Sequence, residues 1–494
     1  MFPTPRARRS AAPRSLLVGA CLSGVVAPEL AHASGLDSPG VGTLQSGPLT
    51  ADPAAIWHNP GQLGFLRSPT LQVGAGLVVG DLTITRERRG VYQSEDTLDF
   101  KSPAAASNLD PSKTGKAGAA SATILSPAGD LFFTSGLGNS GLTLGVGAYA
   151  PYAATVNLPD GGAQRFSVQD AFIAAAHMTG AVGLKVNKHL GLGVGVTYVL
   201  GLASIAKVQD FGALQNFGDA LARKPVAQAN DFGPNAPTDV RELSVLARPV
   251  KVTDGVSHGV TFGAGVSVRP TDDLALALTY QHGAHMSFDG RFSLDLNDDF
   301  FTGDLAHVGM KFQPMVKGKA NVQFNLPQRI GFAGGYEVSP TIHVELRTQY
   351  VRWSTLDAFK IRLTSPDLAQ PALGLPDTSM VSLPRRWNNT FSAAVMGRFG
   401  LNPEGDHPVH LIGLVGYDPP ASPDETVDAS SPDGQRLTVG AGADVGLTQS
   451  MSLVGDLRLI TVLPRTVTTS DNDLGNGRYS LFLAMAGAHL QVRF

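Results

Sequence analysis

One pentapeptide in the sequence has residue types that could carry out nucleophilic chemistry. Residues 255–259 read Gly-Val-Ser-His-Gly and match the G-x-S-x-G pattern, with Ser257 in the position of the nucleophile. In hydrolases this pattern forms a sharp turn from a strand into a helix, which exposes the serine hydroxyl. Here it begins a strand-like alternation over 256–268, and no helical pattern follows. We therefore assign Ser257 no catalytic role and predict that the chain is not an enzyme.

Other segments that could bind a phosphate or a metal lack the residues that such chemistry needs. Residues 191–195 alternate glycine with Leu and Val, as a strand does, and Gly318-Lys319 is followed by Ala320 instead of the Ser or Thr of a phosphate-binding loop. The 12 histidines are scattered, with no pair at ligand spacing beside carboxylates, so we expect no metal and no other cofactor. Glu345 and Arg347 share one strand face and could solvate each other, and a role toward a substrate stays open.

The dominant pattern is strict alternation, which predicts strands with one apolar face. It is clearest in 189–202, 256–268 and 341–350, where every second residue is mostly apolar and the residues between are mostly small or polar. A helix would mix the two sets on one surface, whereas a strand separates them. The residues that this register predicts to face lipid include Leu190, Val194, Val260, Phe262 and Val344.

The composition is typical of a membrane β-barrel. Charged residues make up 16% of the 494 residues and glycine is frequent, with 57 copies, whereas a soluble protein usually carries about 25% charge. Spanning helices would require runs of about 20 apolar residues, and we find none after the first 35 positions. A barrel strand is apolar on one face alone, so low charge without such runs favours an all-β transmembrane barrel.

Fourteen segments show the strand pattern, and the connections between them alternate in length. The segments are 70–86, 129–136, 140–152, 167–186, 189–207, 256–269, 273–292, 320–338, 340–363, 387–399, 408–417, 435–447, 450–464 and 477–494. Tight turns on one side, long loops on the other and an even strand count match a bacterial outer-membrane barrel over 68–494. Counting back from a periplasmic C-terminus places every long loop outside the cell.

The C-terminal strand and three tyrosines support this orientation. Tyr198, Tyr280 and Tyr350 lie on the apolar faces of three rising strands, at the height expected for an aromatic girdle. The last segment alternates up to a terminal Phe494. Such an aromatic-tipped strand resembles the signal read by the barrel-assembly machinery, which is therefore an expected partner.

The N-terminus has the pattern of a secretory signal over 1–33. Four arginines precede an apolar stretch, and Ala31-His32-Ala33 offers a cleavage site before Ser34. A first transmembrane helix and a lipid anchor at Cys21 are less favoured alternatives, because the apolar stretch is short. Cleavage would remove the only cysteine together with four Arg and one Glu, which changes the net charge from −3 to −6. The mature chain would then have no disulfide, and its acidic balance argues against a nucleic-acid partner.

Residues 34–67 precede the first strand and do not alternate. They contain Ile56, Trp57 and Leu63, whose large apolar side chains would be exposed to water in a disordered tail. We therefore expect this segment to be buried inside the barrel. The segment also includes Asp52-Pro53-Ala54 and Asn59-Pro60-Gly61-Gln62-Leu63. These residues resemble the N-terminal hatch motif D-A-S-x-x-x-x-N-P-A-G-L of the FadL-type outer-membrane transporters of long-chain fatty acids and aromatic hydrocarbons. Pro53 and Gly61 depart from that motif.

The resemblance extends over nearly the whole mature chain, including Ala150-Pro151-Tyr152 and Trp353-Ser354. It implies a monomeric fourteen-stranded barrel plugged by a hatch. It also implies passive uptake of a hydrophobic molecule, which enters a groove between two external loops, moves to a deeper pocket and leaves after a hatch rearrangement with a lateral wall opening. We expect the hatch to turn at Asn59, Pro60 and Gly61, to bury Trp57 and to act as the gate.

The two corresponding loops carry apolar residues that a solvated loop would avoid. The candidates for a ligand groove are Phe211, Leu214, Phe217, Leu221, Phe300, Phe301 and Leu305. Packing of the loops on each other is an equally good interpretation of these residues. At the level of the whole protein, the alternative to a channel is an outer-membrane enzyme of the lipase kind, or an adhesion or structural barrel. The first would need a Ser-His arrangement near the outer rim and the second large external domains, and we see neither.

Overall fold

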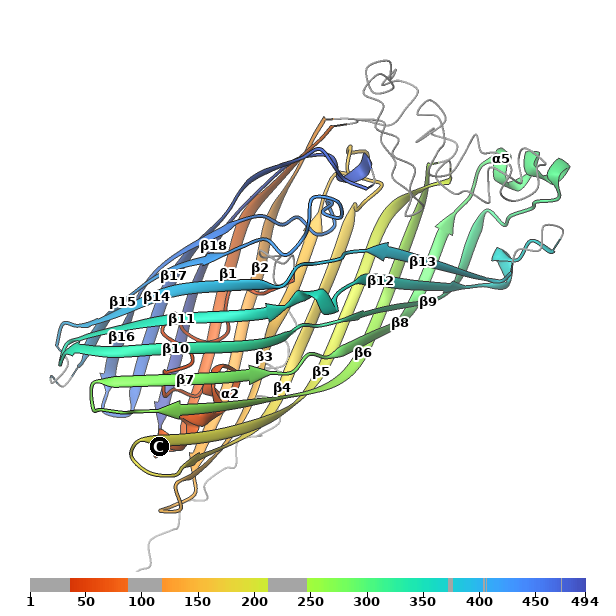
Figure 1. The fold of residues 1–494 in the computed structure, drawn as a ribbon. Helices are drawn as coiled ribbons and strands as arrows, with labels where there is room; N and C mark the ends of the chain where they lie inside the picture. The colour runs from red at the N-terminus through yellow and green to blue at the C-terminus, as the bar shows by residue number, and fades with distance from the viewer. Residues whose placement is uncertain are drawn as a thin grey trace, which may run out of the picture.

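The strands of the chain close into one antiparallel barrel. The computed structural model describes residues 36–87, 118–211, 247–371, 376–402, 405, 407–471 and 473–494. The labelled strands form a single sheet in which the last strand pairs with the first (Figure 1). Four spanning strands are interrupted and carry two labels each, so that fourteen strands make up the wall. The predicted strand number and fold class are therefore confirmed.

The first six spanning strands are continuous and the next four are interrupted. Their bounds are β1 (Thr70–Arg86), β2 (Gly118–Gly136), β3 (Leu142–Asn157), β4 (Asp170–Lys185), β5 (Leu190–Asp210), β6 (Ala247–Val268), β7 (Leu274–Gln281) with β8 (His285–Asp295), β9 (Met315–Asn325) with β10 (Gln328–Ser339), β11 (Ile342–Arg352) with β12 (Ala358–Thr364), and β13 (Thr378–Pro384) with β14 (Thr390–Gly400). The last four are β15 (Val409–Asp418), β16 (Arg436–Thr448), β17 (Met451–Val467) and β18 (Gly477–Arg493).

Helical structure is confined to short pieces. These are α2 (Ala55–His58), α5 (Asp299–Thr302) and the 3₁₀ turns η1 (Pro60–Phe65), η3 (Asp304–Val308), η4 (Trp353–Thr355), η5 (Pro366–Leu368) and η7 (Asp473–Gly475). In the described part of the chain, no helix is long and apolar enough to cross a membrane.

Three strands extend much further outward than the alternation indicated, and five others extend by three to five residues. Residues 118–128, 247–255 and 378–384 were expected in long loops, but they belong to β2, β6 and β13. These extensions are rich in small, polar or charged residues and so lack a clean apolar face. Alternation between apolar and polar residues is the signal that predicts a strand, which is why periodicity alone missed these extensions.

The exposure of the strand residues agrees with the register read from the sequence. Val260 is 71% exposed and Val194 is 59% exposed, whereas Thr261 between the two lipid-facing residues of β6 is 8% exposed. Phe262 and Val344 are also exposed, and Leu190 at the strand end is half-buried. A slip of one residue would exchange the two faces, so these values confirm the register.

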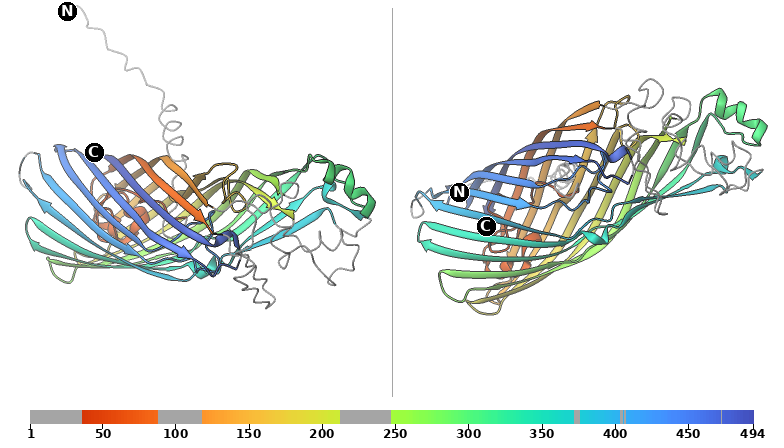
Figure 2. Two further views of the ribbon diagram at one scale, coloured as in Figure 1. Left: turned by 90° about the horizontal axis from the view of Figure 1, so that it is seen from above. Right: turned by 45° about the horizontal axis from the view of Figure 1, so that its top comes forward.

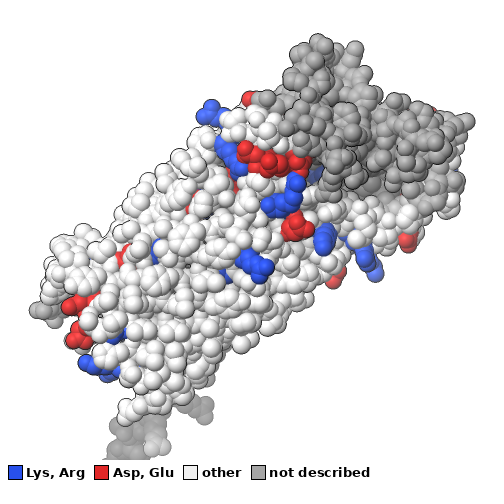
Figure 3. Space-filling model, in the orientation of Figure 1, with Lys and Arg blue, Asp and Glu red and all other residues white. Residues whose placement is uncertain are grey.

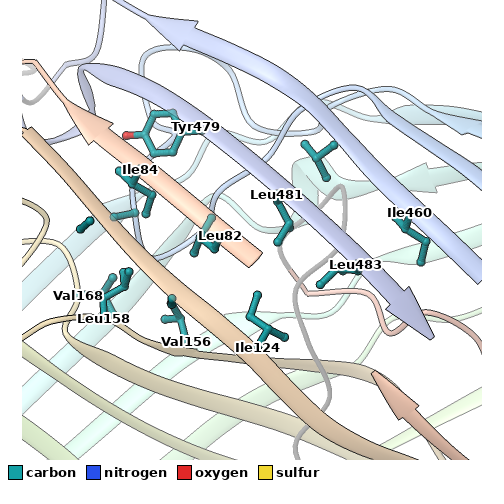
Figure 4. Close-up of a cluster of buried hydrophobic side chains, with 14 of the residues drawn as sticks. Leu82, Ile84, Ile124, Val156, Leu158, Val168, Ile460, Tyr479, Leu481 and Leu483 are labelled. Atoms are coloured by element: carbon teal, nitrogen blue, oxygen red, sulfur yellow. The ribbon is translucent and has the colours of Figure 1, made fainter. Parts of the chain in front are cut away.

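The chain before β1 lies inside the barrel. Figure 1 and both views of Figure 2 place the red and orange segment that contains α2 between the walls, in the half nearer the C-terminus. We call residues 36–67 the hatch. The opposite half of the lumen is lined by apolar side chains from β1, β2, β3, β17, β18 and the loop between β3 and β4, and ten of these side chains are labelled in Figure 4. The barrel interior is thus divided into an inner half that holds the hatch and an outer half lined by apolar groups.

Candidate functional site: the hatch and the outer cavity

Asn59 fixes the turn at the centre of the hatch. Its backbone is extended, with φ −164° and ψ 95°, and its Oδ1 accepts a hydrogen bond from the Gly61 N–H at 3.0 Å. Pro60 follows as the first residue of η1, where its missing N–H costs nothing. The Asn59 Nδ2 donates to the Pro48 carbonyl at 2.7 Å and to the Ser267 hydroxyl of β6 at 2.9 Å. One fully buried side chain therefore joins the turn, the preceding loop and the barrel wall.

Glycines on the lumen face let the hatch backbone lie directly on the wall. A Cβ at Gly193 of β5 would lie 2.1 Å from the Pro60 carbonyl carbon, and one at Gly265 of β6 would lie 1.9 Å from the Asn59 Oδ1. A Cβ on Gly61 would in turn lie 2.7 Å from the Gly265 carbonyl oxygen. The space beside these glycines is filled by the hatch, and Gly61 fits where the related motif has alanine.

Trp57, which we expected the turn to bury, is half-buried. Its ring packs against Tyr149 at a centroid distance of 5.4 Å and against His177 at 5.6 Å. It borders a small cavity beside β4 to β7 and a polar cavity of about 200 Å³ on the side of β10 and β11. The side-chain amide of Gln281 donates a hydrogen bond to the backbone carbonyl of Trp57 at 2.7 Å. The exposed part of the ring therefore faces internal space.

Arg347 holds the hatch from β11. Its guanidinium donates to the carbonyls of Ser46 at 3.0 Å and Gln45 at 2.7 Å, and it pairs with Glu345 at 3.1 Å. The lumen position that the sequence indicated for this pair is therefore observed. Glu345 neutralises the charge of Arg347 on the same strand face. The remaining N–H groups of the guanidinium bind the hatch backbone, so the pair positions the hatch.

A second charged group holds the hatch from β2, β17 and β18. Arg458 pairs with Asp456 at 3.0 Å and donates to the carbonyls of Pro39 and Gly42 at 3.1 Å each. Asp130 accepts the Gly42 N–H at 2.9 Å, and Asp456 accepts the Leu44 N–H at 3.3 Å. His489 lies between the two carboxylates, 3.3 Å from Asp130 and 3.9 Å from Asp456. Backbone groups of the hatch loop thus bind both signs of charge on the wall.

Two buried side chains of the hatch have pKa values far from their usual range. Burial raises the pKa of Asp52 to about 6, although a hydrogen bond from Ser46 lowers it. Burial lowers the pKa of His58 to about 4, and the Nε2 of this ring lies 2.8 Å from the Val41 carbonyl. Because a carbonyl only accepts, Nε2 carries the proton of the neutral ring. Burial therefore keeps His58 neutral at pH 7 and makes Asp52 easier to protonate than an exposed carboxyl, although a group with a pKa of about 6 is mostly ionised at that pH.

The start of the hatch binds the bulged part of β3. The Ser38 N–H donates to the Pro151 carbonyl, and the Ala153 N–H donates to the Leu36 carbonyl, both at 3.0 Å. Asp37 forms an ion pair with Arg329 of β10, and Arg329 donates to the Tyr152 hydroxyl at 3.1 Å. The hatch thus begins as a short strand-like addition to β3.

The barrel wall is incompletely paired at this point. In the described strands, pairing of β2 with β3 runs from Gly136↔Thr143 to Leu131↔Ala148 and does not continue outward, although β2 pairs with β1 from Thr134 out to Gly118. The pairing of β3 with β4 shifts register between Tyr149 and Tyr152. The wall beside the hatch therefore has a local break in its backbone hydrogen bonding.

Above the hatch lies a cavity of about 270 Å³, which we call the outer cavity. Its lining comes from many strands and is mostly apolar, including Ile124, Val156, Phe172, Ile205, Phe288 and Phe324. Leu36 and Trp387 belong both to this lining and to a buried apolar cluster that also contains Tyr152 and Trp353. The two indoles meet edge to face at 5.2 Å. This cluster forms the floor that separates the outer cavity from the hatch.

A few charged groups stand at one side of the outer cavity. Lys207 of β5 and Arg385 line it together with Asp428 and Ser430 of the loop between β15 and β16. Arg385 pairs with Asp428 at 3.2 Å and donates to the Ser430 hydroxyl at 2.9 Å. Burial alone would raise the pKa of Asp428, but Arg385 and the hydrogen bonds from Ser430 lower it. The cavity thus combines an apolar interior with one charged side, where the cations Lys207 and Arg385 stand among the carboxylates Glu425, Asp428 and Asp471.

The loop residues predicted to form a ligand groove pack closely where they are described. Phe211, Phe301 and Leu305 are buried in one cluster, with Phe211 and Phe301 at 5.1 Å, and Phe300 meets Phe301 at 5.2 Å. This arrangement is the loop packing that the sequence left as an alternative. Leu214, Phe217 and Leu221 lie outside the described residues, as does the segment before Leu36 with the predicted cleavage site.

Several residues of the site were not found from the sequence. Asp130, Arg329, Arg458 and His489 hold the hatch or line its seat, and Lys207 and Arg385 line the outer cavity. Most of them are charged or polar residues at inward positions of a strand. A charged residue at every second position, on the face opposite the apolar one, is the sequence signal that could have found them. Ser257 lies inside β6 with its hydroxyl accepting the Ser287 N–H at 2.8 Å, and His258 points outward. Among the described residues, no three His, Cys, Asp or Glu side chains group as metal ligands.

The closed wall, the internal hatch and the apolar cavity define a plugged β-barrel of the kind typical of the outer membrane. The sequence pattern of the outer membrane protein transport protein family (OMPP1/FadL/TodX) matches residues 32–484. The chain belongs to this family, whose members form outer-membrane channels for hydrophobic molecules.

Solved structures of the family have the same fold. A Pseudomonas aeruginosa FadL homologue is 18% identical, with a TM-score of 0.71 over 95% of this chain and 99% of that chain. The Ralstonia pickettii toluene transporter TbuX is 14% identical, with a TM-score of 0.59 over 94% and 98% of the two chains. The Pseudomonas putida toluene transporter TodX is 14% identical, with a TM-score of 0.57 over the same shares. A search of curated proteins found no match to this chain.

Proposed function

We propose that this chain takes up a hydrophobic molecule with an acidic head, such as a long-chain fatty acid, by passive movement through the bacterial outer membrane. The observation that carries the proposal is the outer cavity, which is apolar over most of its lining and has Lys207 and Arg385 at one side. An apolar tail gains free energy by leaving water, at roughly 0.8 kcal/mol per buried methylene. A carboxylate gains from the two cations, because charge-assisted hydrogen bonds are stronger than neutral ones.

The proposed path has two gates. The ligand enters the outer cavity from the side of the external loops and rests on the floor that contains Leu36, Tyr152 and Trp387. Leu36 and Asp37 connect this floor directly to the hatch, so a ligand that shifts Leu36 would disturb the bonds of Ser38 and Asp37 to the wall. The unpaired stretch between β2 and β3 lies beside the same bonds and is our candidate for the lateral opening.

The partners of this function are the hydrophobic ligand and membrane lipid. We also propose that the barrel works as a monomer, that the machinery which assembles outer-membrane barrels reads its C-terminal strand up to Phe494, and that the groove near Phe211 and Phe301 is a first contact for ligand. Phe211, Phe301 and Leu305 are buried against one another, so a groove there would require those loops to separate.

Ligand binding to the purified barrel tests the proposal. Trp387 lines the outer cavity, so its fluorescence should change when oleate is added. Ala203→Phe places a large ring in the cavity, and we expect it to weaken binding at least tenfold while the barrel stays folded. Ala486→Phe on the exposed face of β18 is the matched control and should bind as the unchanged protein does. Equal binding by both variants would refute the cavity as the site.

The head group is tested separately. Lys207→Gln should lower the affinity for oleate about tenfold and leave the affinity for the neutral oleyl alcohol unchanged, because a charge-assisted bond contributes on the order of 1.5–3 kcal/mol. Lys188→Gln, in the short turn before β5, removes the same charge far from the cavity and is the control. If Lys207→Gln bound both ligands as before, the cavity would be a site for neutral hydrocarbons.

A further inference from the structure

The four interrupted strands break at one level of the barrel wall. The breaks lie between β7 and β8, β9 and β10, β11 and β12, and β13 and β14, which are neighbours in the sheet. Exposed polar side chains bond to one another on the outside there. The Tyr198 hydroxyl lies 2.6 Å from His258, and His285 lies 2.9 Å from the Asn325 side chain. These residues form a polar belt around this side of the barrel.

The outward face changes character across the belt. On β10, inside the belt, the exposed residues include Ile330, Phe332, Tyr336 and Val338. On β9, which continues the same spanning strand outward, the outward positions from Asn325 are Gln323, Asn321, Lys319 and Lys317. An apolar band bounded by polar and aromatic residues is the lipid-facing surface of a barrel. The belt therefore marks its outer edge, and the wall beyond it meets lipid headgroups.

Six cations gather on this outer wall. They are Lys251, Arg291, Lys317, Lys319, Lys360 and Arg362, and all six are exposed. The register joins them, because Arg291 of β8 lies opposite Lys319 of β9, and Arg362 of β12 lies opposite Asn321 between Lys319 and Gln323. In Figure 3 much of the visible wall carries no charge, and the charged residues of both signs appear toward its two ends, including the end where β8, β9, β12 and β13 lie.

The carboxylates on the same face do not balance these cations. Asp254 pairs with Arg291, Asp289 accepts a hydrogen bond from Asn321 at 2.8 Å, and Asp295 pairs with Arg248 at 3.5 Å. Among the described residues, the ammonium groups of Lys251, Lys317, Lys319 and Lys360 form no ion pair within 4.0 Å. The patch therefore keeps a net positive charge.

Within the barrel, one of the six cations, Arg291, is paired with a carboxylate, Asp254, and the four lysines add no ion pair among the described residues. Like charges on directly opposed residues such as Arg291 and Lys319 destabilise a sheet. Lysines often protect free sheet edges from pairing with other chains, but β9 is paired on both sides, with β8 and with β12. An anionic partner outside the chain would turn this repulsion into attraction.

We propose that the six cations bind phosphorylated lipid headgroups of the outer leaflet. This surface is separate from the ligand path, and the proposal uses the family's membrane location and not the proposed substrate. Lys360 lies opposite Gln323, two residues beyond Asn325, and Lys317 lies eight residues beyond it. At about 3.3 Å per residue and about 45° tilt, the patch spans roughly 5–20 Å above the belt. Headgroups that carry several phosphates on sugars reach over that range.

Lipid binding by the full chain in detergent micelles tests the proposal. The probes are lipid A, a glycolipid with two phosphates, and phosphatidylcholine, which is neutral overall, with bound lipid counted by native mass spectrometry. We compare Lys317→Gln/Lys319→Gln/Lys360→Gln with the control Arg67→Gln/Lys188→Gln/Arg478→Gln, which removes the same charge from exposed positions elsewhere. The first variant should bind lipid A at least about tenfold more weakly, since each cation near an anionic surface adds about fivefold. The control should bind it as the unchanged protein does.

The remaining outcomes each decide the matter. Loss of lipid A binding with added salt, and unchanged binding of phosphatidylcholine by both variants, would support a headgroup site. Equal affinity of the two variants for lipid A would overturn it. Displacement of lipid A by equimolar inorganic phosphate would also overturn it, because the patch would then hold free anions and not a lipid.

Discussion

The two halves of the lumen are built on opposite principles. The inner half holds the hatch by directed polar contacts, in which Arg347, Arg458 and Asn59 each bind backbone groups of one loop or turn. The outer half encloses a cavity whose walls are mostly aliphatic and aromatic. Hydrogen bonds fix one geometry, whereas apolar contacts tolerate a range of shapes. The comparison indicates that selectivity for size is loose in the outer half and that closure is tight in the inner half.

The largest effect should come from removing the closure. Deleting residues 34–67 takes the hatch out of a lumen whose wall is otherwise complete, and we expect a marked rise in leakage of small polar solutes into liposomes. A smaller disturbance of the closure is Gly193→Val, whose side chain would collide with Pro60 of the hatch and should raise leakage less than the deletion does. Gly180→Val on the neighbouring strand meets nothing within 4 Å and is the control. If deletion changed neither leakage nor uptake of a hydrophobic tracer, the hatch would not be a gate.

The charged contacts of the two halves should differ in energetic weight. Arg458→Met leaves Asp456, whose side chain is fully buried, without its cation, and breaking such a buried pair costs about 3–5 kcal/mol. Arg385→Met in the outer half leaves Asp428, which is 24% exposed, so water can compensate and the loss should be smaller. Urea unfolding of the refolded barrels measures both. A larger loss for Arg385→Met would reverse the comparison.

The turn of the hatch should control uptake more than stability. Asn59→Ala removes a capping bond and the bonds to Pro48 and Ser267, a loss of about 1–2 kcal/mol for a cap of this kind. The barrel should still assemble and resist heat on gels, because the wall pairs without the hatch. Uptake of a hydrophobic tracer should fall. Normal uptake by Asn59→Ala would argue against this turn as the latch.

The sequence was most informative where one simple rule controls the structure. Alternation located all fourteen strands and the faces of Val194 and Val260, because lipid on one side forces a period of two. It missed the outer parts of β2, β6 and β13, where small, polar and charged residues obscure that period. It could not show that Arg458 and Asp130 meet the hatch, since those contacts join residues about 90 to 420 positions apart. Long-range pairing depends on the closed barrel, which no local pattern encodes.

The smallest expected effect concerns the loop that covers the outer cavity, and it depends on pH. Asp433 of this loop accepts the N–H groups of Ala421 and Ser422 at 2.8 Å and 2.7 Å, and burial raises its pKa to about 7. Since the raised value means that the folded loop binds the proton more tightly than the unfolded chain, its stabilisation is complete below about pH 3.8 and is lost as the pH rises through about 7.

Hydrogen exchange of residues 419–434 should therefore be slower at pH 6 than at pH 8, after correction for the intrinsic rate. Asp433→Asn stays neutral, so its corrected exchange should not change over this range, while Asp424→Asn, whose carboxylate meets Arg465 nearer the surface, should keep the dependence. The same pH dependence in Asp433→Asn would show that another titratable group controls the loop and would refute the role of Asp433.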